Sequence, residues 1–305
     1  MLLLFEQLLN GLQLGITLFL MSAGLTLVFG IMQVINLAHG SFYMIGAYVG
    51  AAVTATTGSF LLGVLAALPA AGLVGMAVEW LVLRHLYHRD HLDQVLATFG
   101  LILFFNELAR IIWGRQPLFM DVPPWLAGNV ELVDGLAYPV YRLAVIVTGL
   151  AVALLLWFLF TRTRLGMKIR AGANNREMVG ALGVDISLLY TLVFGLGALL
   201  AGLAGVMAGP ILAVESGMGE SILILTFVVI VIGGIGSIKG AVIGALLVGL
   251  VDTLGRAFLP VVFRLLFASS TADAAAASLA SMAIYILMAA VLIWRPRGLF
   301  PVHSG

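Results

Sequence analysis

Three polar residues interrupt the apolar amino-terminal third of the chain. Gln33, Asn36 and His39 lie between two apolar stretches, and Ser41 follows directly. In hydrocarbon, non-helical backbone is tolerated only where protein packs on it or where it lines a cavity. Amide, imidazole and hydroxyl groups at such a break could exchange hydrogen bonds with a passing zwitterion. The alternative, which the sequence leaves equally open, is that Asn36, His39 and Ser41 only satisfy the interrupted backbone.

A second interruption is rich in glycine. Residues 222–249 form two apolar runs that join at Gly233, Gly234 and Gly236, and they carry a single lysine, Lys239. Broken helices of this kind form the substrate paths of many transport proteins. Glycines four residues apart also let helices approach closely, and we favour packing over direct substrate contact for them. Such spacing occurs at Gly236, Gly240 and Gly244, at Gly205 and Gly209, and at Gly46 and Gly50.

Lys239 does not belong to a nucleotide site. A P-loop requires the pattern G-x-x-x-x-G-K-[ST], in which amides, lysine and hydroxyl meet phosphate and magnesium. Lys239 follows Ile238 and precedes Gly240, so this pattern fails. A pumping function would therefore depend on a separate ATPase.

Two pairs of opposite charges lie one helical turn apart inside apolar segments. They are Glu107 with Arg110 and Asp252 with Arg256. An ion pair is the least costly way to hold two charges within a membrane. We favour a structural ion pair over a substrate site in both cases.

No enzyme chemistry is predicted. His85, His88 and His91 are spaced by three residues, but no carboxylate with matching geometry accompanies them, so a metal site is not favoured. The chain has no cysteine, which excludes disulfides, thiolate catalysis and Cys-ligated zinc. No metal-ligand or nucleophile–base set is recognisable, and we expect no cofactor.

Long apolar segments must position these residues. Apolar residues make up 62% of the 305 positions and charged residues 10%, against about 45–50% and 25% in ordinary globular chains. The balance of 15 basic and 14 acidic residues argues against nucleic acid as a partner. The first segment lacks the basic region and small-residue cleavage site of a signal peptide, so we expect it to be retained.

The pattern predicts an all-α, polytopic membrane protein with eight or nine transmembrane helices, some of them broken. Residues 1–305 leave no room for a separate soluble domain, so we expect a single transmembrane domain. The predicted spans are 5–30, 41–57, 59–83, 94–112, 141–161, 189–213, 221–235, 240–258 and 278–294.

Lys and Arg predict the orientation, because cytoplasmic loops retain an excess of them. Alternating the predicted spans places ten on one face and five on the other, so the first face is expected to be cytoplasmic. Residues 113–140 and, with two crossings before residue 57, the amino terminus are then outside. The ten are Arg84, Arg89, Arg162, Arg164, Lys168, Arg170, Arg176, Lys239, Arg295 and Arg297, and the five are Arg110, Arg115, Arg142, Arg256 and Arg264.

The largest cytoplasmic insert, residues 162–188, carries a helix signal of its own. Asn174 is a suitable N-cap, Glu177 falls at the third helical position of a capping box, and Gly183 suits the C′ position. This spacing predicts an eight-residue helix outside the membrane.

Met178, Val179 and Leu182 would give this helix an apolar stripe, too small for a core but able to dock into a groove on another protein. Gly180 weakens the helix by about 1 kcal/mol relative to alanine. An ordinary solvated basic loop is the alternative.

Four stretches resemble the membrane permease, H type, of branched-chain amino acid ABC importers. The likeness covers nearly the whole chain, and the motifs occur in the family's order. They are GLTLVFGIMQVINLAHGSFYMIGAYVG (24–50), RAGANNREMVGALGVD (170–185), GLGALLAGLAGVMAGP (195–210) and TFVVIVIGGIGSIKGAVIGALLVG (226–249).

The resemblance implies a multi-pass subunit of the bacterial inner membrane, embedded in the lipid bilayer. It would pair with a second homologous permease subunit, sit on two cytoplasmic ATPase subunits, and receive cargo from a periplasmic substrate-binding protein. The residues expected to couple to the ATPase are Asn174, Asn175, Glu177, Met178, Leu182 and Gly183. Those expected along the translocation path are Asn36, His39, Ser41, Gly233, Gly234 and Gly236.

Branched-chain or other hydrophobic amino acids are the expected cargo, and ATP hydrolysis is expected on the separate subunits. Related permeases carry urea, short amides or other small organic solutes, so these remain alternatives. A different class, a secondary transporter that needs no ATPase, would place coupling ions at its broken helices. The predicted cytoplasmic helix argues against that class.

Overall fold

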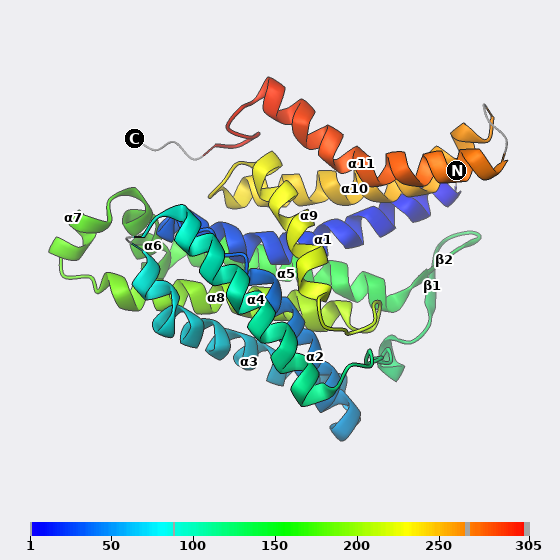
Figure 1. Ribbon diagram of the computed structural model, residues 1–305. Coiled ribbons are helices and arrows are strands. Elements are labelled where there is room, and N and C mark those ends of the chain that lie inside the picture. Colours follow the sequence, from blue (N-terminus) through cyan, green and yellow to red (C-terminus); the bar gives the residue numbers. More distant parts are fainter. Residues whose placement is uncertain (1, 88, 266–268, 302–305) are drawn as a thin grey trace.

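Helices make up most of the computed structural model, which describes residues 2–87, 89–265 and 269–301 (Figure 1). A two-stranded hairpin and two short 3-10 turns, η1 and η2, complete the described elements. In chain order these are α1 (Leu2–Met32), α2 (His39–Thr57), α3 (Phe60–Leu81), η1 (Leu83–Leu86), α4 (His91–Trp113), η2 (Pro124–Leu126), β1 (Asn129–Val133), β2 (Leu136–Pro139), α5 (Val140–Arg162), α6 (Arg164–Asn174), α7 (Arg176–Ala181), α8 (Ile186–Ala208), α9 (Met218–Gly233), α10 (Ile238–Phe263) and α11 (Ser269–Trp294).

Seven helices in the described part of the chain are long and apolar enough to cross a membrane. They are α1, α3, α4, α5, α8, α10 and α11, and α9 is a shorter apolar helix of 16 residues. Each of the nine predicted spans overlaps one helix, the two remaining ones being α2 and α9. The boundaries differ most at α11, which begins at Ser269 rather than near residue 278.

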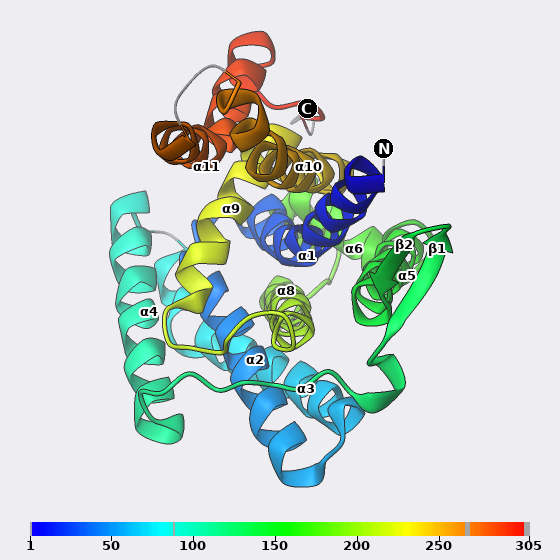
Figure 2. The ribbon, with the colours of Figure 1, turned by 90° about the vertical axis from the view of Figure 1, so that its right-hand side faces the viewer.

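α1 occupies the centre of the bundle. Its most apolar window is 83% buried, against 22% for α4 and α11, and it packs against α5, α8, α9 and α10 (Figure 2). A helix that is apolar all round is stable only when it is buried on all sides. The outer helices instead expose large apolar side chains such as Leu103, Leu154 and Ile293, which suits a lipid environment.

Glycine pairs mark the crossings of these helices. A Cβ on at least one glycine of such a pair would contact the backbone of the other, so the helices approach as closely as two backbones can. The predicted packing role is confirmed for Gly46, Gly205, Gly240 and Gly244, each of which faces backbone of a neighbouring helix. The pairs are Gly24 with Gly197, Gly40 with Gly219, Gly46 with Gly202, Gly15 with Gly249, and Gly233 with Gly240.

The hairpin β1–β2 is an addition to the predicted all-helical fold. Val133 pairs with Leu136 across Asp134 and Gly135, and Gly135 has a φ of +84°. Gly135 supplies the positive φ that this tight turn requires, and the register shifts between Glu131 and Val133. The β2 side chains Leu136 and Tyr138 are buried.

The two ends of the bundle carry different elements. α6 and α7 lie at one end, and the start of α1 and the hairpin lie at the opposite end (Figure 1). The predicted cytoplasmic insert and residues 113–140 are therefore far apart, as opposite faces of a membrane require.

Single cysteines provide a direct test of the orientation, because the native chain has none. A cysteine at Thr163, the N-cap of α6, is expected to react with an impermeant maleimide only from the cytoplasmic side. One at Asn129, in β1, is expected to react only from outside. Ser304, which we also expect inside, lies outside the described residues. Labelling of Asn129 from the cytoplasm would reverse the orientation, and the parent chain is the unlabelled control.

Candidate functional site

The first helix break is shorter than the sequence suggests, spanning residues 33–38 between α1 and α2. Gln33 has a φ of 54°, the one positive φ of a non-glycine among the residues described. Asn36 is fully buried, and its Oδ1 accepts from the N–H of Ala38 at 3.0 Å. The amide nitrogen of Asn36 has no hydrogen-bond partner in the described structure.

His39 begins α2 and is also fully buried. Its Nε2 lies 3.2 Å from the carbonyl oxygen of Met21, and its ring meets the edge of Phe42 at 6.1 Å. Because a carbonyl only accepts, the proton belongs on Nε2 and leaves Nδ1 as an acceptor. Nδ1 has no partner within the described ranges.

These unpartnered atoms bear on the two interpretations of the break. A buried polar atom without a partner costs about 1–3 kcal/mol, so a purely structural break would leave few of them. The Asn36 amide nitrogen and the His39 Nδ1 are both such atoms. They favour a role in which a solute or water completes their hydrogen bonds.

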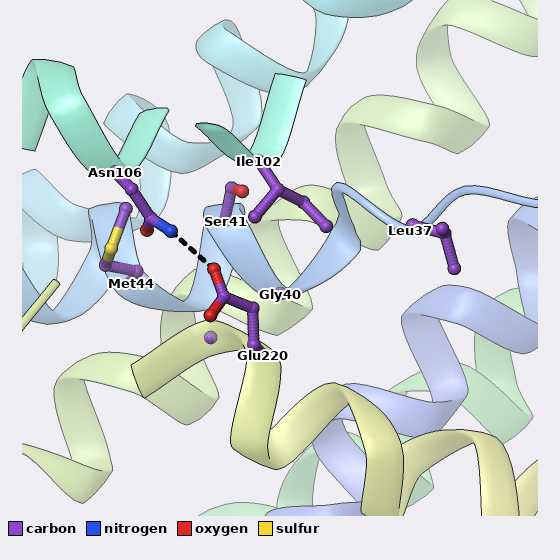
Figure 3. Close-up of a pocket in the computed structure, with 8 residues that line it drawn as sticks. Leu37, Gly40, Ser41, Met44, Ile102, Asn106 and Glu220 are labelled. Carbon is purple, nitrogen blue, oxygen red and sulfur yellow. Dashed lines mark hydrogen bonds between the residues drawn. The ribbon is translucent and has the colours of Figure 1, made fainter. Parts of the chain in front are cut away.

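Ser41 lines a narrow cleft between the starts of α2 and α9 and the middle of α4 (Figure 3). Across this cleft the amide of Asn106 donates to the carboxylate of Glu220. Glu220 lies in the first turn of α9, where free backbone N–H groups favour a negative charge. The Asn106–Glu220 contact was not predicted, although an asparagine inside an apolar span is a signal for it. The lining residues are Leu37, Gly40, Ser41, Met44, Ile102, Asn106, Gly219 and Glu220.

The second break lies between the end of α9 at Gly233 and the start of α10. Gly234 and Gly236 have φ values of +103° and +82°, which disfavour any side chain with a Cβ. Ser237 caps α10 by accepting from the N–H of Gly240 at 3.1 Å. This break is therefore a defined turn with its own cap.

The segment after α11 covers the second break. The N–H groups of Leu299 and Phe300 donate to the carbonyls of Ile232 and Gly233, each at 2.9 Å. A helix ends with unsatisfied carbonyls, and these two bonds satisfy two of them at α9. The sequence analysis did not assign this role to the tail; Gly298, with a φ of +83°, packs on Gly234 and marks the turn.

The last turn of α1, directly before the first break, packs against the second break. A Cβ built on Gly30 would lie 3.3 Å from the Cα of Gly236. Gly40, however, packs against Gly219 at the other end of α9. Since α9 is about 24 Å long, the structure divides the predicted path residues between its two ends.

The predicted cytoplasmic helix exists, but its start differs. α6 continues through Asn174, and the N–H of Asn175 bonds to the carbonyl of Ala171 at 2.9 Å. Asn175 is the N-cap of α7 instead, accepting from the N–H of Met178 at 3.0 Å. Glu177 then occupies the second helical position, so the predicted capping box at Asn174 is wrong.

The end of α7 agrees with the prediction at Gly183. Its φ is +87°, the N–H of Val184 bonds to the carbonyl of Val179 at 3.3 Å, and Gly183 itself bonds to Gly180 at 3.0 Å. These bonds form a Schellman motif. The helix has six residues rather than eight, and Met178 and Leu182 are 62% and 78% exposed whereas Val179 is buried.

A cleft of about 250 Å³ lies between the insert of residues 162–188 and the first break. On one side it is lined by Ile31 and Gln33, and on the other by residues 172–177. α6 packs against both α1 and α7 and so links the two sides of this cleft.

Both predicted ion pairs form. Glu107 and Arg110 are 3.4 Å apart and largely exposed, and Asp252 and Arg256 are 2.9 Å apart. His85 lies in η1 and His91 begins α4, whereas His88 lies outside the described residues.

Sequence reasoning missed a buried carboxylate near the insert of residues 162–188. Glu79, at the end of α3, is fully buried and accepts from the hydroxyls of Tyr87 and Thr191, the latter at 2.6 Å, and from Arg84 at 3.3 Å. Burial raises the pKa of the Tyr87 hydroxyl above its usual range, and its bond to Glu79 adds to the rise. The network joins α3 and η1 to α8 across 112 residues of sequence, so no local pattern reveals it.

Comparison with known proteins agrees with this architecture. Residues 7–292 match the family described as branched-chain amino acid transport system, permease component. The chain is 30% identical over 272 residues to the high-affinity branched-chain amino acid permease protein LivH of Escherichia coli K12, covering 85% of this chain and 88% of LivH. It is 32% identical over 266 residues to BraD of Pseudomonas aeruginosa, covering 82% and 85%.

A more distant relative is the ribose import permease protein RbsC of E. coli, 25% identical over 246 residues, which cover 76% of this chain and 72% of RbsC. No solved structure matches. The family match over most of the chain, the helix pairs broken at glycines, and the capped helix outside the spans agree with one another. The chain therefore belongs to the family of permease components of branched-chain amino acid transport systems.

Proposed function

We propose that this chain forms one half of the membrane passage of an ATP-driven importer for branched-chain or other hydrophobic amino acids. It pairs with a second homologous permease, binds two cytoplasmic ATPase subunits, and receives its cargo from a periplasmic binding protein. The family supports membership of a multi-component transport system, and the chain's own residues support the finer assignments.

The cleft between α7 and the first break carries this proposal. Residues proposed to contact the ATPase line one side of this cleft, and Gln33, which directly follows α1, lines the other side. Met178 and Leu182 provide the exposed apolar contact, and the Asn175 cap and Gly183 turn hold α7 in place. The other residues proposed for this contact are Asn174 and Glu177.

We propose that the passage itself runs along the two breaks. Asn36 and His39 supply buried polar atoms without partners, and Ser41 lines the cleft at the start of α9. The backbone of Gly233, Gly234 and Gly236 forms the inner side. α2 and α9 complete nine crossings, and the amino terminus lies outside.

Other cargo and another mechanism are the competing proposals. Permeases for ribose and D-allose are among the more distant relatives, so a sugar or another small polar solute is the alternative cargo. A secondary transporter would need no ATPase contact, and the exposed Met178 and Leu182 argue against it.

Reconstitution of the complete transporter tests the function. Proteoliposomes that contain both permeases and both ATPases are expected to accumulate radiolabelled L-leucine only with the liganded binding protein outside and hydrolysable ATP inside. A non-hydrolysable ATP analogue is the control. Uptake of leucine without ATP, or of ribose in place of every branched-chain amino acid, would refute the proposal.

A further inference from the structure

A polar groove lies at the end of the molecule opposite to α7, between α1, α5 and α10. Its volume is about 420 Å³, within the range of about 300–1,000 Å³ that is usual for small-molecule sites. Two guanidinium groups and one carboxylate line it, together with three side-chain amides. The residues that line it and carry this chemistry are Gln7, Asn10, Gln13, Arg142, Asp252 and Arg256.

The charged groups of this groove are held in place. Arg256 Nε donates to both carboxylate oxygens of Asp252 at 3.0 and 2.9 Å, and Asp252 is only 7% exposed. Arg142 donates to the side-chain oxygen of Asn10, which also accepts from Tyr138 at 3.2 Å. The pair at Asp252 leaves Arg256 with further N–H groups that can bind another acceptor.

The depth of Asp252 along α10 argues that the groove faces protein or water rather than lipid. It lies 11 residues, or about 16 Å, before the end of α10 at Phe263. Ionisable side chains at such depth almost always face a protein neighbour or a water-filled cavity, and they mark substrate pathways. Three amides on the same stretch of α1 agree with that placement.

We infer that this groove binds the ammonium and carboxylate groups of a zwitterionic amino acid on its way to the helix breaks. This inference rests on the proposed function. Arg256, with Arg142 beside it, would bind the carboxylate, for which a guanidinium provides a planar pair of donors. Asp252 would bind the ammonium group, and the amides of Gln7 and Gln13 would complete its hydrogen bonds.

The lining indicates which part of the cargo is recognised. Leu14 and Ala257 are the aliphatic residues of the groove, and the other residues that line it carry polar or charged groups. The charged groups, by contrast, are common to all α-amino acids. The groove is therefore selective for the amino-acid backbone, whereas selection of the side chain belongs to another component.

One pair of packed helices, α1 and α10, extends from the groove toward the breaks. α1 and α10 pack along their length, with Gly15 against Gly249 near the groove and Gly30 against Gly236 at the breaks. The groove therefore lies at the opposite end of this helix contact from the second break.

Binding of leucine and of two analogues that lack one charge tests the inference. The assembled transporter in nanodiscs, without binding protein or ATP, is titrated with tritiated L-leucine, and 3-methylbutylamine and 4-methylpentanoate compete. The wild type is expected to bind leucine about tenfold or more tighter than either analogue. Arg256→Gln should weaken the binding of leucine about tenfold but leave the affinity for 3-methylbutylamine undiminished. Asp252→Asn should weaken the binding of leucine and of 3-methylbutylamine but leave the affinity for 4-methylpentanoate unchanged.

Arg264→Gln is the matched control, because Arg264 ends the same helix and also pairs with an aspartate, Asp273, at 2.9 Å. It should change none of the three affinities. Equal losses of affinity for all three compounds in both groove variants, or no leucine binding by the wild type, would overturn the inference. The proposed function is tested separately by ATP-driven uptake. If the wild type takes up leucine but the two variants do not show these different losses of affinity, only the inference about the groove is refuted.

Discussion

Replacing Met178 and Leu182 together with aspartate is expected to reduce ATP-driven uptake at least tenfold while the permease still inserts and folds. Both side chains are exposed, so the substitutions should change the free energy of unfolding by less than about 0.5 kcal/mol. At a protein contact the effect is larger, because each central apolar residue contributes about 2 kcal/mol or more and the new charges would be buried without partners. Uptake and ATP hydrolysis are measured in the same proteoliposomes.

Met167→Asp is the control for this variant. Met167 is a 55% exposed methionine on α6, the neighbouring helix of the same insert, and the substitution adds one of the two negative charges that the double variant adds. It should leave uptake within about twofold of the wild type, as expected for a surface change away from an interface. Normal uptake by the Met178 and Leu182 double variant would rule out α7 as the ATPase contact.

The helices and their breaks were predictable because local pattern determines them. Apolar length predicts the spans, and glycine clusters and polar inserts in hydrocarbon predict the interruptions. The end of α7 was predictable for a similar reason, since a C′ glycine is a local signal. Its start was not, because Asn174 and Asn175 are equally good caps and the continuation of α6 decides between them.

Contacts between distant segments were not predictable. The Glu79 carboxylate accepts a hydrogen bond from Thr191, and the Leu299 N–H donates to a carbonyl at the end of α9. No sequence pattern in these segments predicts which partner each one meets. The hairpin is a different case, because Asp134 and Gly135 form a recognisable turn signal. The reading of the chain as apolar membrane spans left this signal unused.

The glycine positions show the same limit. Gly63 lies inside the predicted span 59–83 with no glycine four residues away, which predicts an ordinary span position where a large side chain has a mild effect. In the structure a Cβ there would overlap the hydroxyl of Thr54 and lie 2.8 Å from the carbonyl oxygen of Gly50. Gly63 is thus a helix contact, and spacing alone does not distinguish it from Gly100, which has open space around it.

Gly236→Leu is expected to abolish uptake without preventing insertion. Its φ of +82° is unfavourable for a residue with a Cβ, at a cost of about 1–2 kcal/mol, and Gly30 packs on its other side. Gly30→Leu separates these two effects, because Gly30 lies inside α1 and has no positive φ. It should still reduce uptake at least tenfold, since overpacking a tight contact costs about 1–3 kcal/mol and forces the two breaks apart.

Gly100→Leu is the control, because it adds the same side chain to a membrane helix with no atom within 4 Å of the new Cβ. Its uptake should match that of the wild type. Membrane extraction and size-exclusion profiles would show that all three variants insert and remain folded. If Gly30→Leu transports normally while Gly236→Leu does not, backbone strain alone explains the loss, and close packing of the two breaks is not needed for transport.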